Sequence, residues 1–198
     1  MITPRRRRIG VICFEWKFLR RNLLYQPRWL IVTVLAVGML SVGSASASAA
    51  KPPTLEFRAS LDKRSYASHE PVMISFMLKN TGKGPAWVNT RFYLSAQSAP
   101  EDDRDVYVIL TAPSGKDIPC TFSYPTGLPK SDYFKSLEPG QEAASESPRD
   151  LHGFFGELKE PGTYTVRAVY HNVFGAELGL DTFKGTLKSP SVTFTITQ

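Results

Sequence analysis

The sequence predicts an all-β protein, an antiparallel β-sandwich of about seven short strands preceded by an N-terminal export segment. From residue 52 onwards, apolar and polar residues alternate with a period of two, which is typical of strands that bury one face. Clusters of Gly, Pro, Asn and Ser separate the alternating stretches, and no long stretch has helical periodicity. These observations favour a sandwich over an α/β fold.

The first 49 residues have the three-part layout of a secretory signal. An uncharged apolar run at 29–43 follows a basic region, and the Ser/Ala stretch at 44–50 offers A-x-A cleavage at Ala47 or Ala49. The basic residues of the first region are Arg5, Arg6, Arg7, Arg8, Lys17, Arg20, Arg21 and Arg28, against the single acid Glu15. Because the apolar run leaves water while the arginines hold its start in the cytoplasm, we expect export.

Two outcomes of export remain open. Residues 29–50 approach the roughly 20 apolar residues of a membrane-spanning helix, so the segment is either a cleaved signal peptide or an uncleaved single-pass anchor. The expected organisation is a signal peptide or anchor at 1–49, a linker at 50–53 and one domain at 54–198. The domain is expected to be periplasmic or secreted, touching the membrane only through an uncleaved N-terminus.

The positive charge of the chain belongs to its export segment. The chain has 24 basic and 18 acidic residues, and residues 1–49 contain 8 of the basic residues and 1 of the acids. The remainder therefore has 16 basic and 17 acidic residues, a net charge of −1, which argues against a nucleic-acid partner. Cys13 lies in the export segment, so the expected mature chain has one thiol, Cys120, and no internal disulfide.

Five strands are expected in the first half of the domain. Their expected ranges are 55–61, 72–78, 88–94, 106–110 and 118–122. In the third strand, one face is assigned to Val88, Thr90, Phe92 and Leu94 and the other to Trp87, Asn89, Arg91 and Tyr93. In the fifth strand, Pro119 lacks an amide donor, which favours a position at the edge of a sheet.

The C-terminal half predicts two further strands, at 163–170 and 192–196. Between the halves, residues 124–159 depart from the alternating pattern. There we expect one weak strand after Pro139-Gly140 and a helical turn at 150–155.

Two short motifs resemble immunoglobulin-like domains. Gly162-Thr163-Tyr164-Thr165-Val166 is similar to the start of strand F, where a tyrosine side chain bonds back to the backbone as the tyrosine corner. Together with Leu137-Glu138-Pro139-Gly140-Gln141, it resembles exported bacterial Ig-like modules. More distantly, it resembles the Ig-like family named after a bacterial intracellular proteinase inhibitor. The resemblance implies an Ig-like sandwich in which Tyr164 is structural, and it assigns no function.

The sequence offers no recognisable catalytic or metal site. Cys120 is followed by no nearby His or Met, as a copper site would need, and His69, His152 and His171 are dispersed. No G-x-S-x-G motif occurs. The acidic run at 101–105 lacks the spacing and glycine of a calcium loop, so we expect a solvated hairpin tip. We therefore expect no enzyme, no cofactor and no metal.

The candidate contact surface lies on two loops at one end of the expected sandwich. It comprises His171, Asn172 and Phe174 on the connection before the last strand, and Asn80 and Lys83 on the loop after residue 79. In the alternative interpretation, Phe174 folds back as a lid over the open end together with Leu178, Leu180 and Phe183.

The functional prediction is an exported, non-enzymatic binding or accessory module that contacts an extracytoplasmic protein or envelope component. Three alternatives remain. The first is a protease inhibitor of the same fold that presents the loop Tyr124 to Tyr133, stiffened by Pro125 and Pro129. The second is an enzyme whose site groups His152 with a serine and an acid. The third is a structural envelope protein.

Overall fold

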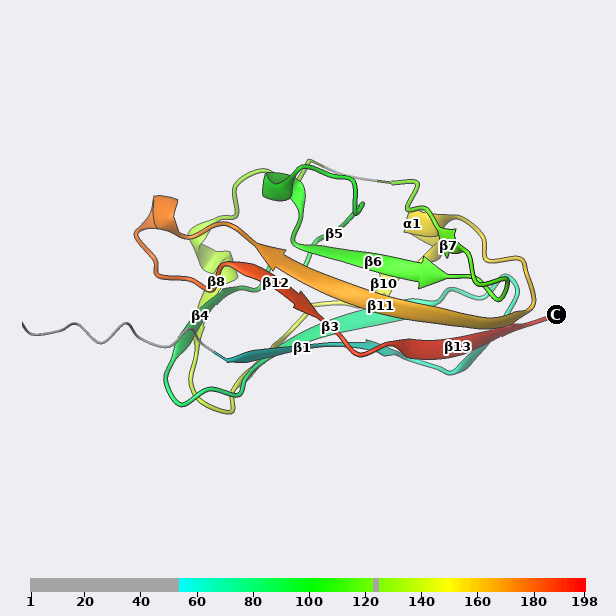
Figure 1. Cartoon of the computed structure of the whole chain (residues 1–198), viewed down its shortest axis with the longest axis horizontal. Helices are drawn as coiled ribbons and strands as arrows, with labels where there is room; N and C mark the ends of the chain where they lie inside the picture. Colours follow the sequence, from blue (N-terminus) through cyan, green and yellow to red (C-terminus); the bar gives the residue numbers. More distant parts are fainter. Residues whose placement is uncertain (1–53, 123–124) are drawn as a thin grey trace, which may run out of the picture. The chain divides into compact units, whose positions relative to one another are not determined.

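The computed structural model describes residues 54–122 and 125–198 and has an all-β fold (Figure 1). The predicted export segment and linker, residues 1–53, lie outside the described residues. Within the described ranges, every helix is too short or too polar to cross a bilayer. The strands form two main sheets and a separate two-stranded ribbon.

The first sheet is centred on β3 (Met73–Asn80). β1 (Leu55–Leu61) runs antiparallel along one edge of β3, and β9 (Glu142–Ala144) and β10 (Arg149–Asp150) pair with the other. Alternate residues of β3 are wholly buried, so the strand packs one face against the core. The predicted strands at 55–61 and 72–78 are thereby confirmed.

The second sheet is centred on β11 (Gly162–Asn172). Its order is β2 (Ser65–Ala67), β13 (Val192–Thr197), β11, β6 (Val106–Thr111) and β5 (Leu94–Ser95), with β12 (Gly185–Lys188) also on β11 and β7 (Asp117–Ile118) on β6. The predicted strands at 106–110, 163–170 and 192–196 are confirmed.

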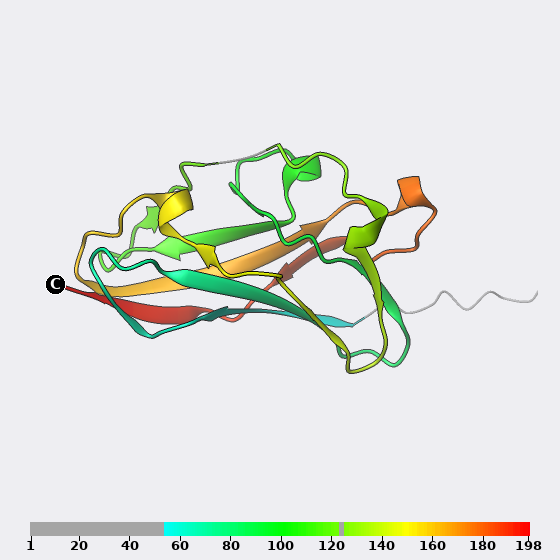
Figure 2. The same ribbon diagram turned by 180° about the vertical axis from the view of Figure 1, so that it is seen from behind.

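Side chains from both sheets share one apolar core. The ring of Phe57 on β1 lies 6.0 Å from that of Phe76 on β3 and 5.7 Å from that of Tyr170 on β11. Seen from front and back, the two sheets lie against one another in a sandwich-like arrangement (Figures 1 and 2). The sequence alternates between apolar and polar residues because each sheet buries one face.

The predicted strand at 88–94 is wrong, because the chain changes sheets in the middle of it. β4 (Ala86–Asn89) pairs with β8 (Phe134–Leu137) in the separate ribbon, whereas β5 joins β6 in the second sheet. Between them, Phe92 has a φ of 49°, a left-handed conformation that a bulky residue adopts only where its surroundings hold it. Its ring is buried in the core, which compensates the local strain.

The remaining elements differ from the expectations in detail. The strand expected at 118–122 is reduced to β7, which ends before Pro119 and lies at the edge of its sheet as expected. The strand after Pro139-Gly140 is present as β9, and the helical turn is α1 (His152–Phe155). Strands β2, β8, β10 and β12 were not predicted. The described ranges also contain the 3₁₀ helices η1 (Glu101–Asp103), η2 (Ser131–Tyr133) and η3 (Ala176–Leu178).

Tyr164 makes the backbone bond that the tyrosine-corner resemblance implies. Its hydroxyl donates a hydrogen bond to the carbonyl oxygen of Glu160 at 2.8 Å, and its buried ring stacks on Phe194 with the centroids 5.3 Å apart. Burial raises the pKa of the Tyr164 hydroxyl above its usual value.

Tyr164→Phe is expected to lower the free energy of unfolding by about 1 kcal/mol, the usual net contribution of one hydrogen bond. Urea unfolding of the purified protein measures this loss. Tyr107→Phe is the control, because the hydroxyl of Tyr107 makes no hydrogen bond within the described ranges. Equal stability of the two variants would contradict a structural role for the Tyr164 hydroxyl.

Candidate functional site

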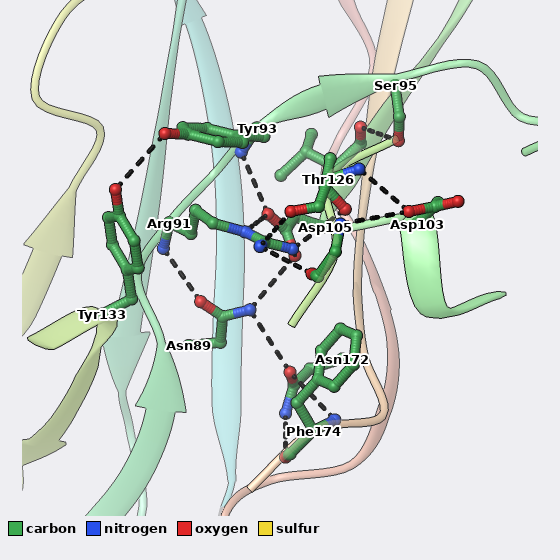
Figure 3. A network of polar contacts seen from close by, with 12 residues as sticks. Asn89, Arg91, Tyr93, Ser95, Asp103, Asp105, Thr126, Tyr133, Asn172 and Phe174 are labelled. Atoms are coloured by element: carbon green, nitrogen blue, oxygen red, sulfur yellow. Dashed lines mark hydrogen bonds and ion pairs between the residues drawn. The ribbon is translucent and has the colours of Figure 1, made fainter. Parts of the chain in front are cut away.

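A buried ion pair lies where the chain crosses from the ribbon to the second sheet (Figure 3). Arg91 precedes β5 and Asp105 precedes β6, and their side chains are 2% and 0% exposed. The sequence predicted Asp105 in a solvated acidic tip, which is wrong. Only Glu101 and Asp102 of that run are exposed, since the chain turns inward after η1. Nothing in the local sequence distinguishes Asp105 from its acidic neighbours.

All five N–H donors of the Arg91 guanidinium are used within the protein. Nε and Nη2 donate to the two carboxylate oxygens of Asp105, and Nη2 also donates to Oγ1 of Thr126 at 3.0 Å. Nη1 donates to the carbonyl oxygens of Thr126 and Gly127 at 3.0 and 2.9 Å. Since arginine has five donors and no acceptor, no donor remains for a ligand, and Arg91 acts as a clamp on the backbone.

A second carboxylate holds the same segment from its amide side. Oδ1 of Asp103 accepts hydrogen bonds from the backbone N–H groups of Thr126 and Gly127 at 2.9 and 3.2 Å (Figure 3). The N–H and C=O groups of two consecutive residues are thus all bonded to side chains. We call residues 125–130 the pinned loop.

Leu128 stands out from the pinned loop into solvent. Its side chain follows Gly127, which has a φ of 59°, and precedes Pro129, which is buried. Leu128 is 71% exposed, more than any other large hydrophobic residue in the described ranges. The protein therefore fixes the backbone on one side of an exposed apolar side chain and buries the residue on its other side.

The ion pair continues into a chain of buried amides. Nδ2 of Asn89 donates to Oδ1 of Asp105 at 3.1 Å and to Oδ1 of Asn172 at 3.4 Å. Nδ2 of Asn172 donates in turn to the carbonyl oxygens of Phe174 and Phe183 at 3.0 and 2.7 Å. Asn172 therefore closes the connection between β11 and β12, while Asn89 ties that connection to the ribbon.

Most of the predicted contact residues are packed inside the protein. Asn80 and Asn172 are fully buried, Phe174 is 4% exposed, and His171 is also buried, which leaves Lys83 exposed. The two loops lie at the same end of the fold (Figure 1). Asn80 uses its side chain to donate to the carbonyl oxygens of Gly84 and Leu137. Phe174 is buried as the lid alternative expects, whereas Leu178, which that alternative also folds back, is 41% exposed.

The surroundings of His171 disfavour the charged form of its imidazole. Burial, together with the positive charge of Arg104, lowers the pKa of its imidazole. Its Nδ1 lies 3.2 Å from Oγ1 of Thr186, and its Nε2 is buried without a hydrogen-bond partner in the described part of the chain. Residues 54–122 and 125–198 contain no group of three or more His, Cys, Asp or Glu side chains placed to hold a metal ion.

An open cleft of about 510 Å³ lies beside the ion pair. Its lining residues are Thr90, Arg91, Tyr93, Leu94, Pro125, Thr126, Tyr133, Glu146, Ser147, Arg149 and Phe154. Tyr93 and Tyr133 meet there at an interplanar angle of 65°, with their hydroxyl oxygens 3.3 Å apart (Figure 3). The hydrogen bond to Tyr93 raises the pKa of Tyr133. We call this hollow the tyrosine cleft.

Comparison with known proteins adds little to this description. No family model matches the sequence, and no curated protein matches it significantly. Among solved structures, a β-glucosidase from Erythrobacter marinus has 15% sequence identity and a TM-score of 0.32. That match covers 73% of this chain but 16% of the glucosidase, so this chain spans a small part of that protein. The strands and shared core of the described residues define an all-β, sandwich-like protein.

Proposed function

We propose that the chain is an exported Ig-like β-sandwich that acts as a non-enzymatic binding module. Two sheets with a shared core and the bond from Tyr164 to Glu160 support the Ig-like assignment. The apolar run behind eight basic residues supports export. The partner contact is Leu128, and the observation that carries this assignment is its exposure on a loop pinned by buried charges.

The energetics of the pinned loop favour a contact role. Burying a carboxylate and a guanidinium costs several kcal/mol of desolvation, which their mutual bonds must offset. Here those bonds fix the main chain immediately before Leu128. A contact residue on a fixed backbone loses less conformational entropy on binding, and apolar anchors that fill a pocket supply much of the energy of an interface.

Site-specific photo-crosslinking in the native envelope tests this proposal. A photoreactive side chain at position 128 is expected to give one discrete protein adduct, whereas the same group at position 178 is not. Leu178 is the matched control, because it is an exposed leucine, 41% accessible, on a different loop. Purified wild-type protein should compete the adduct away, and the Leu128→Asp protein should not. Equal competition by both would contradict the contact role, and absence of the chain from the extracytoplasmic fraction would contradict export.

The same loop favours protease inhibition as a second candidate function. The inhibitor alternative requires a rigid loop within Tyr124 to Tyr133, and the described part of that loop has a clamped backbone beside an exposed leucine. Leucine suits proteases that prefer apolar side chains. Leu128→Arg should therefore transfer inhibition from chymotrypsin-like or elastase-like enzymes to trypsin-like enzymes. No inhibition of either class by the wild-type protein and the variant would exclude this candidate.

A further inference from the structure

The tyrosine cleft has the size and preformed walls of a small-molecule site. Its volume of about 510 Å³ lies within the range of about 300–1,000 Å³ typical of ligand pockets. It is separate in role from Leu128, which does not line it. Its walls come from the segment between β4 and β5, from η2 and α1, from β10 with the chain that enters it, and from Pro125 and Thr126 of the pinned loop.

Contacts with neighbouring residues hold the main chain of Tyr133 and the ring of Tyr93. The carbonyl oxygen of Tyr133 accepts hydrogen bonds from the N–H and the Oγ1 of Thr90, at 2.7 and 2.8 Å. The guanidinium carbon of Arg91 lies 5.3 Å from the centroid of the Tyr93 ring, which is a cation–π distance. Tyr93 is nevertheless 39% exposed. The cleft therefore presents an aromatic surface whose position is fixed before any ligand arrives.

Three polar side chains of the cleft are uncommitted. Arg149, Glu146 and Ser147 line it, and none of their side chains makes a hydrogen bond or ion pair within the described ranges. Arg149 is a donor only and the Glu146 carboxylate an acceptor only, while Ser147 can act as either. Since the Arg91 donors are all used, these three groups and the tyrosine hydroxyls are what the cleft offers a ligand.

The combination of charges selects the chemistry of the ligand. An anion would be attracted by Arg149 and repelled by Glu146, and a cation would experience the reverse. A neutral polyhydroxylated molecule suits both, because each hydroxyl group accepts from the guanidinium or donates to the carboxylate. The C–H face of a sugar ring also has an apolar surface that can cover an exposed aromatic ring.

We propose that the tyrosine cleft binds a neutral oligosaccharide, with one sugar ring on Tyr93 and its hydroxyl groups bonded to Arg149, Glu146 and Ser147. This ligand is independent of the partner that contacts Leu128.

Calorimetric titration of the exported form of the chain tests the proposal. The probes are four neutral tetrasaccharides, namely cellotetraose, maltotetraose, laminaritetraose and chitotetraose, with tetragalacturonic acid and the chitosan tetramer as charged counterparts. At least one neutral probe should bind saturably, and more tightly than either charged one. Tyr93→Ala should weaken that binding by about tenfold or more, because the stacking surface is lost.

Two variants make the outcome interpretable. Arg149→Met should also weaken binding of the neutral tetrasaccharide. Arg149 is partly exposed, so this substitution does not remove a group from the core. Leu128→Ala should leave saccharide binding unchanged, so failure of this inference and failure of the proposed partner contact are distinguishable. Unchanged melting temperatures establish that the variants are folded. The proposal is overturned if no neutral probe binds at millimolar concentration, if a charged probe binds best, or if Tyr93→Ala has no effect.

Discussion

Arg91→Leu is expected to destabilise the protein by about 3–5 kcal/mol, the usual cost of removing one partner of a buried ion pair. The substitution would leave the Asp105 carboxylate, which is fully buried, with hydrogen bonds from Asn89 and from the backbone N–H of Tyr93. It would also release the carbonyl oxygens of Thr126 and Gly127. Urea unfolding measures the loss, and limited proteolysis should show faster cleavage within the pinned loop.

Two further variants interpret that result. Arg58→Leu removes an arginine whose partner, Glu56, is on the surface, and should cost at most about 1 kcal/mol. Arg91→Met combined with Asp105→Leu should recover part of the loss, because no unpaired charge stays buried. If Arg91→Leu costs no more than Arg58→Leu, the ion pair does not hold the fold together as described.

Phe174→Ala is expected to lower the free energy of unfolding by about 3 kcal/mol or more, as for other large-to-small changes in a core. Phe174 is 4% exposed, its ring centroid lies 6.0 Å from the guanidinium carbon of Arg91, and its carbonyl oxygen accepts from Asn172. Thermal unfolding of the variant measures the effect. Leu178→Ala is the control, since it removes an exposed side chain from the same connection.

A Phe174→Ala protein that melts like the wild type would contradict the lid interpretation. It would instead favour the contact surface that the sequence predicts at His171, Asn172 and Phe174. Weakened partner capture with unchanged stability is the result that this alternative requires.

The strands that bury one face were predictable from the sequence because burial imposes a period of two. Val106, Val108 and Leu110 on β6 show this pattern, and Val192, Phe194 and Ile196 repeat it on β13. The tyrosine motif was equally readable, since the hydrogen bond of Tyr164 is local and reaches back four residues. The sequence therefore predicted those strands and turns whose formation depends on neighbouring residues alone.

The candidate site depends on distant contacts, which a local pattern does not contain. The alternation of residues 88–94 predicted one strand, yet these residues serve two different sheets because Phe92 turns the chain between them. Arg91 and Asp105 lie fourteen residues apart, and the sequence around each does not show that the two side chains meet. One local signal was available: Leu128 is an apolar residue between Gly127 and Pro129, where a turn is usually polar.

Under the proposed contact role of Leu128, the clamp on the pinned loop would connect recognition to folding. Arg91 contacts main-chain atoms 35 and 36 positions further along the chain, so these bonds need the tertiary fold around Arg91. In an incompletely folded or damaged chain, the loop that carries Leu128 would be flexible, and its affinity for the proposed partner would be lower. If the proposed partner binds the native state alone, its presence would shift the folding equilibrium towards the native state by mass action. Under that proposal, only fully folded molecules would be bound.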